Sequence, residues 1–113
     1  TALKKNPNTQ TYTALGIALW QLDRVDEAIA NLRAAIKADP KNTAPYDPLG
    51  TILVQQGKLE EAASVYRDLI RNRPSAAAHQ ELAQVLTRLG RTDEARKEME
   101  MAKALDRSQG AAQ

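Results

Sequence analysis

Apolar and small residues recur three and four positions apart in the middle of the chain, which is the spacing of one face of an α-helix. Before residue 57 this face consists of Tyr46, Leu49, Gly50 and Leu53. Gly57 follows, and glycine readily adopts the left-handed backbone conformation that ends many helices. Pro45 and Pro48 fall in the predicted first turn, where a missing N–H costs little, and we expect Pro48 to make the start slightly irregular.

A second stripe with the same spacing begins after this turn. Its members are Ala62, Tyr66, Leu69 and Ile70. Pro74 ends the stripe, because proline lacks the N–H that would continue a helix and clashes with the turn before it. The two stripes predict a pair of helices joined by a tight turn. A pair this small needs neighbouring pairs to bury its apolar faces.

The same pattern occurs three times. A shift of 34 residues superposes the first copy on the second, and the matched pairs are Tyr12 and Tyr46, Leu15 and Leu49, Gly16 and Gly50, Ala28 and Ala62, and Pro40 and Pro74. A third copy follows with one residue deleted at the junction, and its equivalent residues are Leu82, Ala83, Leu86, Gly90 and Ala95. We therefore predict a single domain over residues 8–107, with repeats at about 9–42, 43–75 and 76–107.

Small residues mark the places where the two helices of each copy should approach closely. They are Gly16, Gly50 and Ala83 in the first helices and Ala28, Ala62 and Ala95 in the second helices. We expect large neighbours to fill the space between successive pairs, namely Leu15, Tyr66 and Met99. A larger residue at one of the small positions should overpack the pair, at a cost of about 1–3 kcal/mol.

This arrangement resembles the tetratricopeptide repeat (TPR). The resemblance rests on the period and on the order aromatic, Leu-Gly, apolar, Gly, acidic-Ala, aromatic, Ala and Pro, and it covers nearly the whole chain. The chain departs from the family pattern at three slots. The usual Trp slot holds Tyr12, Tyr46 and His79 in the three copies, and in the third copy Ala83 replaces the Gly and Arg107 the closing Pro. The resemblance implies an all-α, right-handed superhelical solenoid of antiparallel helix pairs, whose first helices line a concave surface.

Proteins of this family generally hold peptides or folded partners, so the resemblance implies a groove. The side chains of the first helices that face away from their partner helices are Thr13, Ile17, Trp20, Gln21, Asp47, Thr51, Val54, Gln55, Gln80, Gln84, Thr87 and Arg88. This surface is mostly uncharged, with amides able to bond to a peptide backbone. Trp20 is open to two interpretations: a binding hot spot, or a ring packed on the neighbouring helix near Val54 or Gln55.

One mode of binding is disfavoured. Members of the family that dock chaperones grip an acidic C-terminal tail with Lys, Asn and Arg side chains, which supply charge-assisted contacts. The matching slots in this chain hold Thr13, Ile17, Pro48, Ala77 and Glu81. None of them has the required chemistry, so we do not expect a terminal carboxylate to be captured in that manner.

The two ends of the chain differ. Residues 1–7 resemble residues 35–40 and are predicted to be the tail of a preceding repeat's second helix. In the first two copies the side facing the next repeat is apolar, through Ile29, Ile36, Ala63 and Ile70. The third copy has Arg96 and Lys103 at those positions, as expected of a terminal capping surface. Residues 108–113 are small and polar and are predicted to form a flexible tail.

Composition narrows the possible functions. The formal net charge is only +2, with no clustered patch of Lys and Arg, which argues against binding to nucleic acid. The chain contains no cysteine, so it forms neither disulfides nor thiolate metal sites, and it fits a reducing compartment such as the cytoplasm. No apolar run approaches the roughly 20 residues of a membrane helix, so we expect no direct insertion into a membrane.

Catalytic chemistry is not indicated. His79 is the only histidine, and we expect it to pack in the aromatic slot at a repeat junction. Glu60 with Glu61, and Glu98 with Glu100, are one or two residues apart, so they cannot face each other on a helix and are interpreted as solvated residues. No phosphate loop, nucleophile elbow or metal-ligand spacing occurs. We predict no catalytic residues, no metal and no cofactor.

The leading hypothesis is a non-catalytic scaffold that binds a segment of a partner protein or peptide in the concave groove. An alternative is a structural module that associates with further copies of itself as a homo-oligomer. A more remote alternative is the regulatory domain of an enzyme whose catalytic part precedes Thr1. Fold alone does not choose among these.

Overall fold

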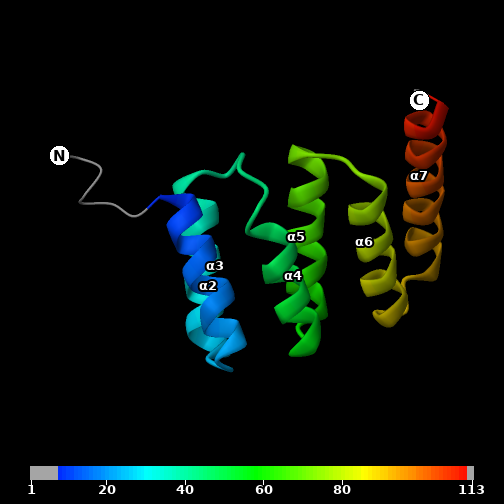
Figure 1. The fold of residues 1–113 in the computed structure, drawn as a ribbon. Coiled ribbons are helices and arrows are strands. Elements are labelled where there is room, and N and C mark those ends of the chain that lie inside the picture. Colours follow the sequence, from blue (N-terminus) through cyan, green and yellow to red (C-terminus); the bar gives the residue numbers. More distant parts are fainter. Residues whose placement is uncertain (1–7, 112–113) are drawn as a thin grey trace.

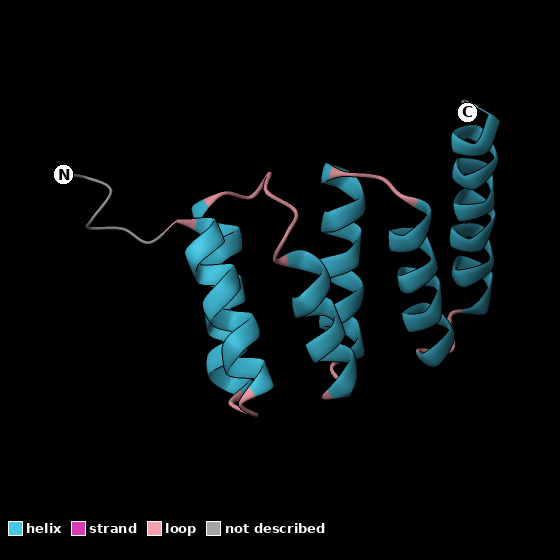
Figure 2. Cartoon of the chain, in the orientation of Figure 1, coloured by secondary structure: helices cyan, strands magenta, loops and turns pink. Residues whose placement is uncertain are grey.

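The computed structural model describes residues 8–111, which contain six helices and no strand (Figures 1 and 2). The helices are α2 (Thr9–Gln21), α3 (Val25–Ala38), α4 (Tyr46–Gln55), α5 (Leu59–Asn72), α6 (Ala76–Arg88) and α7 (Thr92–Ala111). The predicted remnant of a preceding repeat, residues 1–7, lies outside the described residues.

The helices form three antiparallel pairs that follow one another in chain order (Figure 1). The pairs are α2 with α3, α4 with α5, and α6 with α7, and α3 also packs on α4 while α5 packs on α6. The main helix–helix contacts are therefore between neighbours in the sequence, as in a quasi-one-dimensional repeat array. The predicted all-α solenoid of helix pairs is confirmed.

Local sequence explains where the first helices begin. Asn8 and Ser75 precede α2 and α6, and their side chains accept hydrogen bonds from the backbone N–H groups of Thr11 (2.8 Å) and Ala78 (3.1 Å). Such caps satisfy N–H groups that the helix itself leaves unpaired. Helix α4 has no side-chain cap and begins only after Pro45.

The turn inside each pair uses a left-handed backbone conformation at equivalent positions. The φ angles are 63° at Asp23, 77° at Gly57 and 81° at Gly90. Glycine adopts this conformation without penalty, whereas a residue with a Cβ atom pays about 1–2 kcal/mol. The sequence pattern shows the two glycines but gives no hint that Asp23 shares their conformation.

Close packing within the pairs depends on Gly16 and Gly50. A Cβ atom at Gly50 would lie 2.5 Å from Cζ of Tyr66, and one at Gly16 would lie 2.8 Å from Cγ of Leu32. Leu32 and Tyr66 are fully or almost fully buried at matching positions of α3 and α5. The predicted close approach at these glycines is therefore confirmed.

The outer sides of the first and last described helices are less covered than the sequence pattern predicts. Tyr66 is 3 % exposed, but Leu15 on α2 is 47 % exposed and Met99 on α7 is 36 % exposed. The expectation that all three fill the space between pairs is therefore wrong for Leu15 and Met99. The reason is geometric, because within residues 8–111 no helix precedes α2 and none follows α7.

The C-terminal side of α7 has the charged character predicted for it. Arg96 and Lys103 are both exposed, where the first two copies place buried or half-buried apolar residues. Helix α7 continues through Ser108 to Ala111, so it extends into the region predicted as a tail. Residues 112–113 lie outside the described residues.

Candidate binding surface

Five of the predicted groove residues line a single pocket between α4 and α6, with α5 at its base. They are Thr51, Val54, Gln55, Gln84 and Arg88. Three further residues complete the lining, namely Tyr66 from α5 and Glu81 and Val85 from α6. The pocket has a volume of about 210 Å³. It combines apolar, amide and charged groups, and is the place where the predicted groove residues converge.

Thr13 and Ile17 lie at a different hollow, between α2 and the loop before α4. This hollow has a volume of about 520 Å³ and is lined additionally by Gln10, Ala14, Asn42 and Ala44. Thr13 is buried, and its hydroxyl donates to the carbonyl oxygen of Thr9 at 2.7 Å. Little of the Thr13 side chain is thus left to contact a partner.

The remaining predicted residues line neither hollow. Trp20 is half-buried and packs against the core cluster. The Thr87 hydroxyl donates to the carbonyl oxygen of Ala83 at 2.9 Å. Exposed side chains on the first helices include Gln21, Asp47, Gln80 and Thr87.

The sequence pattern missed the two polar residues at the base of the pocket, Glu81 and Tyr66. Burial, followed by the neighbouring carboxyl of Asp47, raises the pKa of Glu81 to about 7, and the Tyr66 hydroxyl offsets part of the rise. Burial also raises the pKa of Tyr66 well above its usual range. Glu81 therefore titrates near neutral pH, in a pocket where its partner is another acid.

A signal for this acidic pair was present in the sequence. Asp47 lies in the first turn of α4 and Glu81 in the second turn of α6, and the repeat places successive first helices near each other. From the sequence, Glu81 is predicted only as a mismatch to a basic clamp and Tyr66 only as a packing residue, whereas both line the pocket.

His79 occupies the buried position predicted for it, with 6 % of its surface exposed. Its Nδ1 atom lies 2.7 Å from Oε1 of Glu98 on α7. The interpretation of Glu98 as a solvated residue is therefore wrong, because the turn of the helix brings it under the imidazole. This contact joins α6 to α7 within the last pair, away from the pocket.

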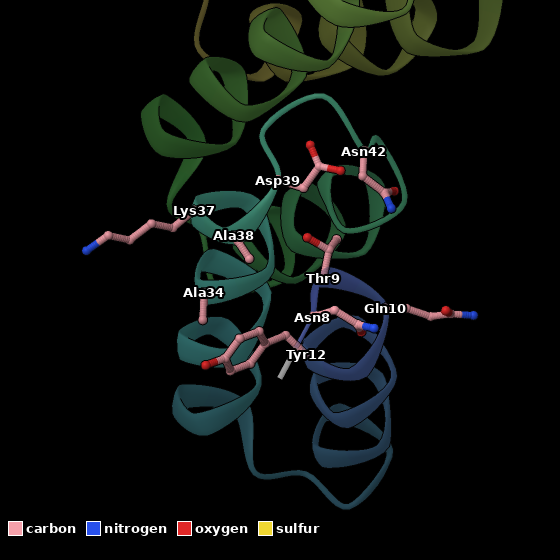
Figure 3. Close-up of a pocket in the computed structure, with 9 residues that line it drawn as sticks. All are labelled: Asn8, Thr9, Gln10, Tyr12, Ala34, Lys37, Ala38, Asp39 and Asn42. Atoms are coloured by element: carbon pink, nitrogen blue, oxygen red, sulfur yellow. The ribbon is translucent and has the colours of Figure 1, made fainter. Parts of the chain in front are cut away.

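A larger hollow lies at the start of α2 and the end of α3, with a volume of about 670 Å³ (Figure 3). Tyr12, Lys37 and Asp39 are among the side chains around it in the figure. Asn8, which also lines it, follows directly on residues that the structure does not describe. Its free volume consequently carries no argument for a ligand.

Two family models match the chain, both described as "Tetratricopeptide repeat". One matches residues 48–112, which is more than half of the chain, and the other matches residues 9–42. The chain belongs to the tetratricopeptide repeat family. TPR domains are generally non-catalytic interaction modules, and the helix pairs described above accord with that class.

Solved structures show the same TPR architecture. A structure titled "Crystal structure of MamA" is 25 % identical with a TM-score of 0.87, covering 92 % of this chain and 61 % of that one. "MamA MSR-1 C2" is 26 % identical with a TM-score of 0.80, covering 90 % and 59 %. The chain thus spans less than two thirds of these relatives. No curated protein sequence matches it.

A further structure shares the fold at lower identity. "Crystal structure of YrrB: a TPR protein with an unusual peptide-binding site" is 20 % identical, with a TM-score of 0.77, covering 89 % of this chain and 53 % of that one. At this identity the likeness establishes only the TPR fold. The binding described in that title belongs to YrrB.

Across residues 8–111 the structure shows no group of three His, Cys, Asp or Glu side chains able to hold a metal ion. In the same part of the chain, no helix has the length and apolar character needed to cross a membrane.

Proposed function

We propose that the chain is a non-catalytic scaffold that binds a segment of a partner protein or peptide on its concave face. The pocket between α4 and α6 carries this proposal, because it gathers five groove positions from two repeats around one hollow. Pockets that hold ligands combine apolar lining with a few polar groups that fix orientation.

The chemistry of the lining suits a peptide. Val54 and Val85 offer apolar contact, and the amides of Gln55 and Gln84 can donate to and accept from a peptide backbone. Arg88 adds a fixed positive charge at the end of α6. Among the described residues, the concave face has no group of side chains arranged for catalysis, so binding is the activity that this surface supports.

The proposal is tested by selecting short random peptides displayed on phage against the immobilised full chain. Selected peptides should bind the wild type and lose roughly tenfold or more in affinity for a Val54→Ala, Gln84→Ala variant. A Met101→Ala, Gln56→Ala variant is the matched control, since both of those side chains are exposed and lie outside the pocket. Equal binding to both double variants, or failure to select any peptide, would contradict the proposal.

A second function, self-association, is favoured by the outer side of α2. Tyr12 is half-buried and Leu15 is 47 % exposed, whereas the equivalent Tyr46 and Leu49 are buried in the second copy. Exposed apolar surface of this kind pairs readily with another chain. Light scattering over a range of concentrations tests it, because a monomer at every concentration contradicts self-association and a dimer lost in Leu15→Ser supports it.

A further inference from the structure

Arg88 is the only lysine or arginine on the three first helices, α2, α4 and α6. The equivalent residues of the first two copies are Gln21 and Gln55, so the third copy has a charge where the others have an amide. Arg88 is exposed and lines the pocket between α4 and α6. The face formed by the first helices is otherwise poor in positive charge, and it thus has one fixed cation at this pocket.

Arg88 also differs from most other arginines in its pairing. Across residues 8–111, six arginines form ion pairs with a carboxylate, as Arg33 does with Glu61 at 3.1 Å. In that part of the chain Arg88 pairs with no carboxylate, and the same holds for Arg73 and Arg107, which do not line the pocket. The guanidinium of Arg88 therefore keeps its N–H donors for a ligand or for solvent.

Two amide side chains accompany Arg88 in the lining of the pocket. Gln84 is four residues earlier on α6, so one helical turn places it on the same face, with its Cβ about 5–6 Å from that of Arg88. Gln55 lines the pocket from α4. Each amide has two N–H donors, and a guanidinium can bind a carboxylate through two parallel N–H groups. Because the guanidinium has donors only, the three side chains together suit a carboxylate and not a cation.

Glu81, the acidic residue of the lining, does not neutralise Arg88. The two residues are seven positions apart on α6, or about 10 Å along the helix axis. Burial and the neighbouring Asp47 raise the pKa of Glu81 to about 7. Near neutral pH this carboxyl therefore has only part of a negative charge, whereas the guanidinium stays fully charged. Positive charge thus dominates the end of the pocket where Arg88 lies.

The volume of the pocket limits how much of a partner it can hold. Pockets that hold whole small molecules typically have volumes of about 300–1,000 Å³. This pocket has a volume of about 210 Å³, so it admits one side chain of a segment that lies across α4 and α6. Val54 and Val85 also line it and offer apolar contact to the methylene groups of that side chain.

We propose that the segment bound at this pocket carries an aspartate or glutamate whose carboxylate accepts hydrogen bonds from Arg88. The amides of Gln55 and Gln84 donate to the same carboxylate or to the backbone beside it. This inference rests on the function proposed above and names the chemistry of the partner. A lysine or arginine at the same place in the segment is repelled, so the pocket also rejects segments of the wrong charge.

The peptides selected on the full chain test this inference by their composition. Each displayed peptide is fused to the coat protein through its C-terminus, so any carboxylate that is selected belongs to a side chain. Aspartate or glutamate should be enriched at one position on the wild type and not on Arg88→Gln. Peptides that lose binding to the Val54→Ala, Gln84→Ala variant but have no acidic residue would overturn the inference and leave the proposed function standing. If no peptide depends on the pocket, both fail.

A selected peptide, synthesised with an amidated C-terminus, provides the quantitative test. Replacing its acidic residue with the corresponding amide should weaken binding roughly tenfold on the wild type and less than about twofold on Arg88→Gln, as expected of two groups in contact. Arg73→Gln is the matched control, since it removes an exposed arginine outside the pocket and should keep wild-type affinity. Equal losses on the wild type and on Arg88→Gln would contradict the proposed contact. Thermal melting followed by circular dichroism separates lost binding from lost folding.

Salt gives an independent readout. Affinity for the acidic peptide should fall on the wild type as sodium chloride rises from about 0.01 M to about 1 M, because the Debye length shortens from about 30 Å to about 3 Å. The affinity of Arg88→Gln should change much less, since its apolar and amide contacts remain while the charged contact is absent. An equal salt dependence in the two proteins would place the charged contact elsewhere and overturn the inference.

Discussion

The junction between the first and second repeats differs from the junction between the second and third at equivalent positions. Leu32 on α3 corresponds to Tyr66 on α5, and Pro48 on α4 corresponds to Glu81 on α6. The first junction therefore has two apolar residues where the second has a phenol and a carboxyl group. Both junctions are built from the same kind of helix pair, so the difference is chemical and not architectural.

The repeat retains the packing of these positions while their polarity changes. Leu32 covers Gly16 and Tyr66 covers Gly50 in the same manner, so either large side chain satisfies the core. Tyr66 additionally presents a hydroxyl to the pocket beside Glu81. Repeat proteins can thus keep their fold and acquire a binding site at one junction by replacing side chains at fixed positions.

Reversing a charge at the second junction has the largest expected effect. We predict that Glu81→Lys lowers affinity for a selected peptide by roughly tenfold or more, because it places a longer side chain of opposite charge in the lining of the pocket. Ala14→Lys, at the equivalent exposed position of α2, should leave affinity within about twofold. Isothermal titration calorimetry of both variants measures this, and equal losses would remove the distinction between the junctions.

Overpacking the glycines should have the next largest effect. Gly50→Ala places a Cβ atom 2.5 Å from Cζ of the Tyr66 ring, whereas Gly16→Ala places one 2.8 Å from Cγ of Leu32 and 3.2 Å from the carbonyl oxygen of Ala28. We predict a loss of about 2 kcal/mol in the free energy of unfolding for Gly50→Ala and a smaller loss for Gly16→Ala. Urea unfolding of the two variants gives the comparison, and a larger loss at Gly16 would contradict it.

The second junction should also make stability depend on pH. The pKa of Glu81 is raised to about 7 in the folded chain, so the folded state holds a proton that the unfolded state releases near the ordinary value. The stabilisation that protonated Glu81 contributes is fully present below the pKa of its carboxyl in the unfolded chain. It is lost as pH rises through the folded-state pKa of about 7.

After allowance for solvent screening of this half-exposed group, the loss should be about 1 kcal/mol between pH 5 and pH 8. Glu81→Gln should remove most of this slope, because the amide does not titrate, and urea unfolding at both pH values measures it. The first junction has Pro48 at this position and contributes nothing comparable. An unchanged slope in Glu81→Gln would assign the pH dependence to other groups.

The smallest expected effect compares the turns within the repeats. Asp23 has a φ of 63°, where the second and third copies use glycine. We predict that Asp23→Gly stabilises the chain by about 0.5 kcal/mol, since relief of the left-handed strain is partly offset by the entropy of glycine. Gly57→Ala should instead destabilise. Thermal melting of the two variants checks the sign, and destabilisation by Asp23→Gly would contradict the account.

Periodicity predicted most of the fold. The spacing of Leu49, Gly50 and Leu53 and the stop at Gly57 gave a helix pair, and three matching copies gave an array. These features are local or repeat at a fixed interval, so a single sequence displays them. The end of α7 was harder to predict from the sequence, because residues 108–111 have weak helical character and continue a helix that has already begun.

The candidate site was predicted only in part, for a physical reason. Thr51, Val54 and Gln84 followed from helix phase, because each faces away from its own partner helix. The meeting of Tyr66 and Glu81 requires the relative placement of three helices, which the phase of one helix does not specify. The pairing of His79 with Glu98 was missed for the same reason, since it joins two helices through side-chain reach.

The most direct test of the central claim is to map a selected peptide on the full chain by NMR, using backbone amide shifts during a titration. The account predicts saturable shifts concentrated at Asp47, Thr51, Glu81 and Gln84, around the second junction. It also predicts that these shifts are lost in the Val54→Ala, Gln84→Ala variant, whose substitutions lie in the pocket lining. Shifts concentrated at the first junction, around Thr13 and Ile17, would contradict the assignment of binding to the pocket between α4 and α6.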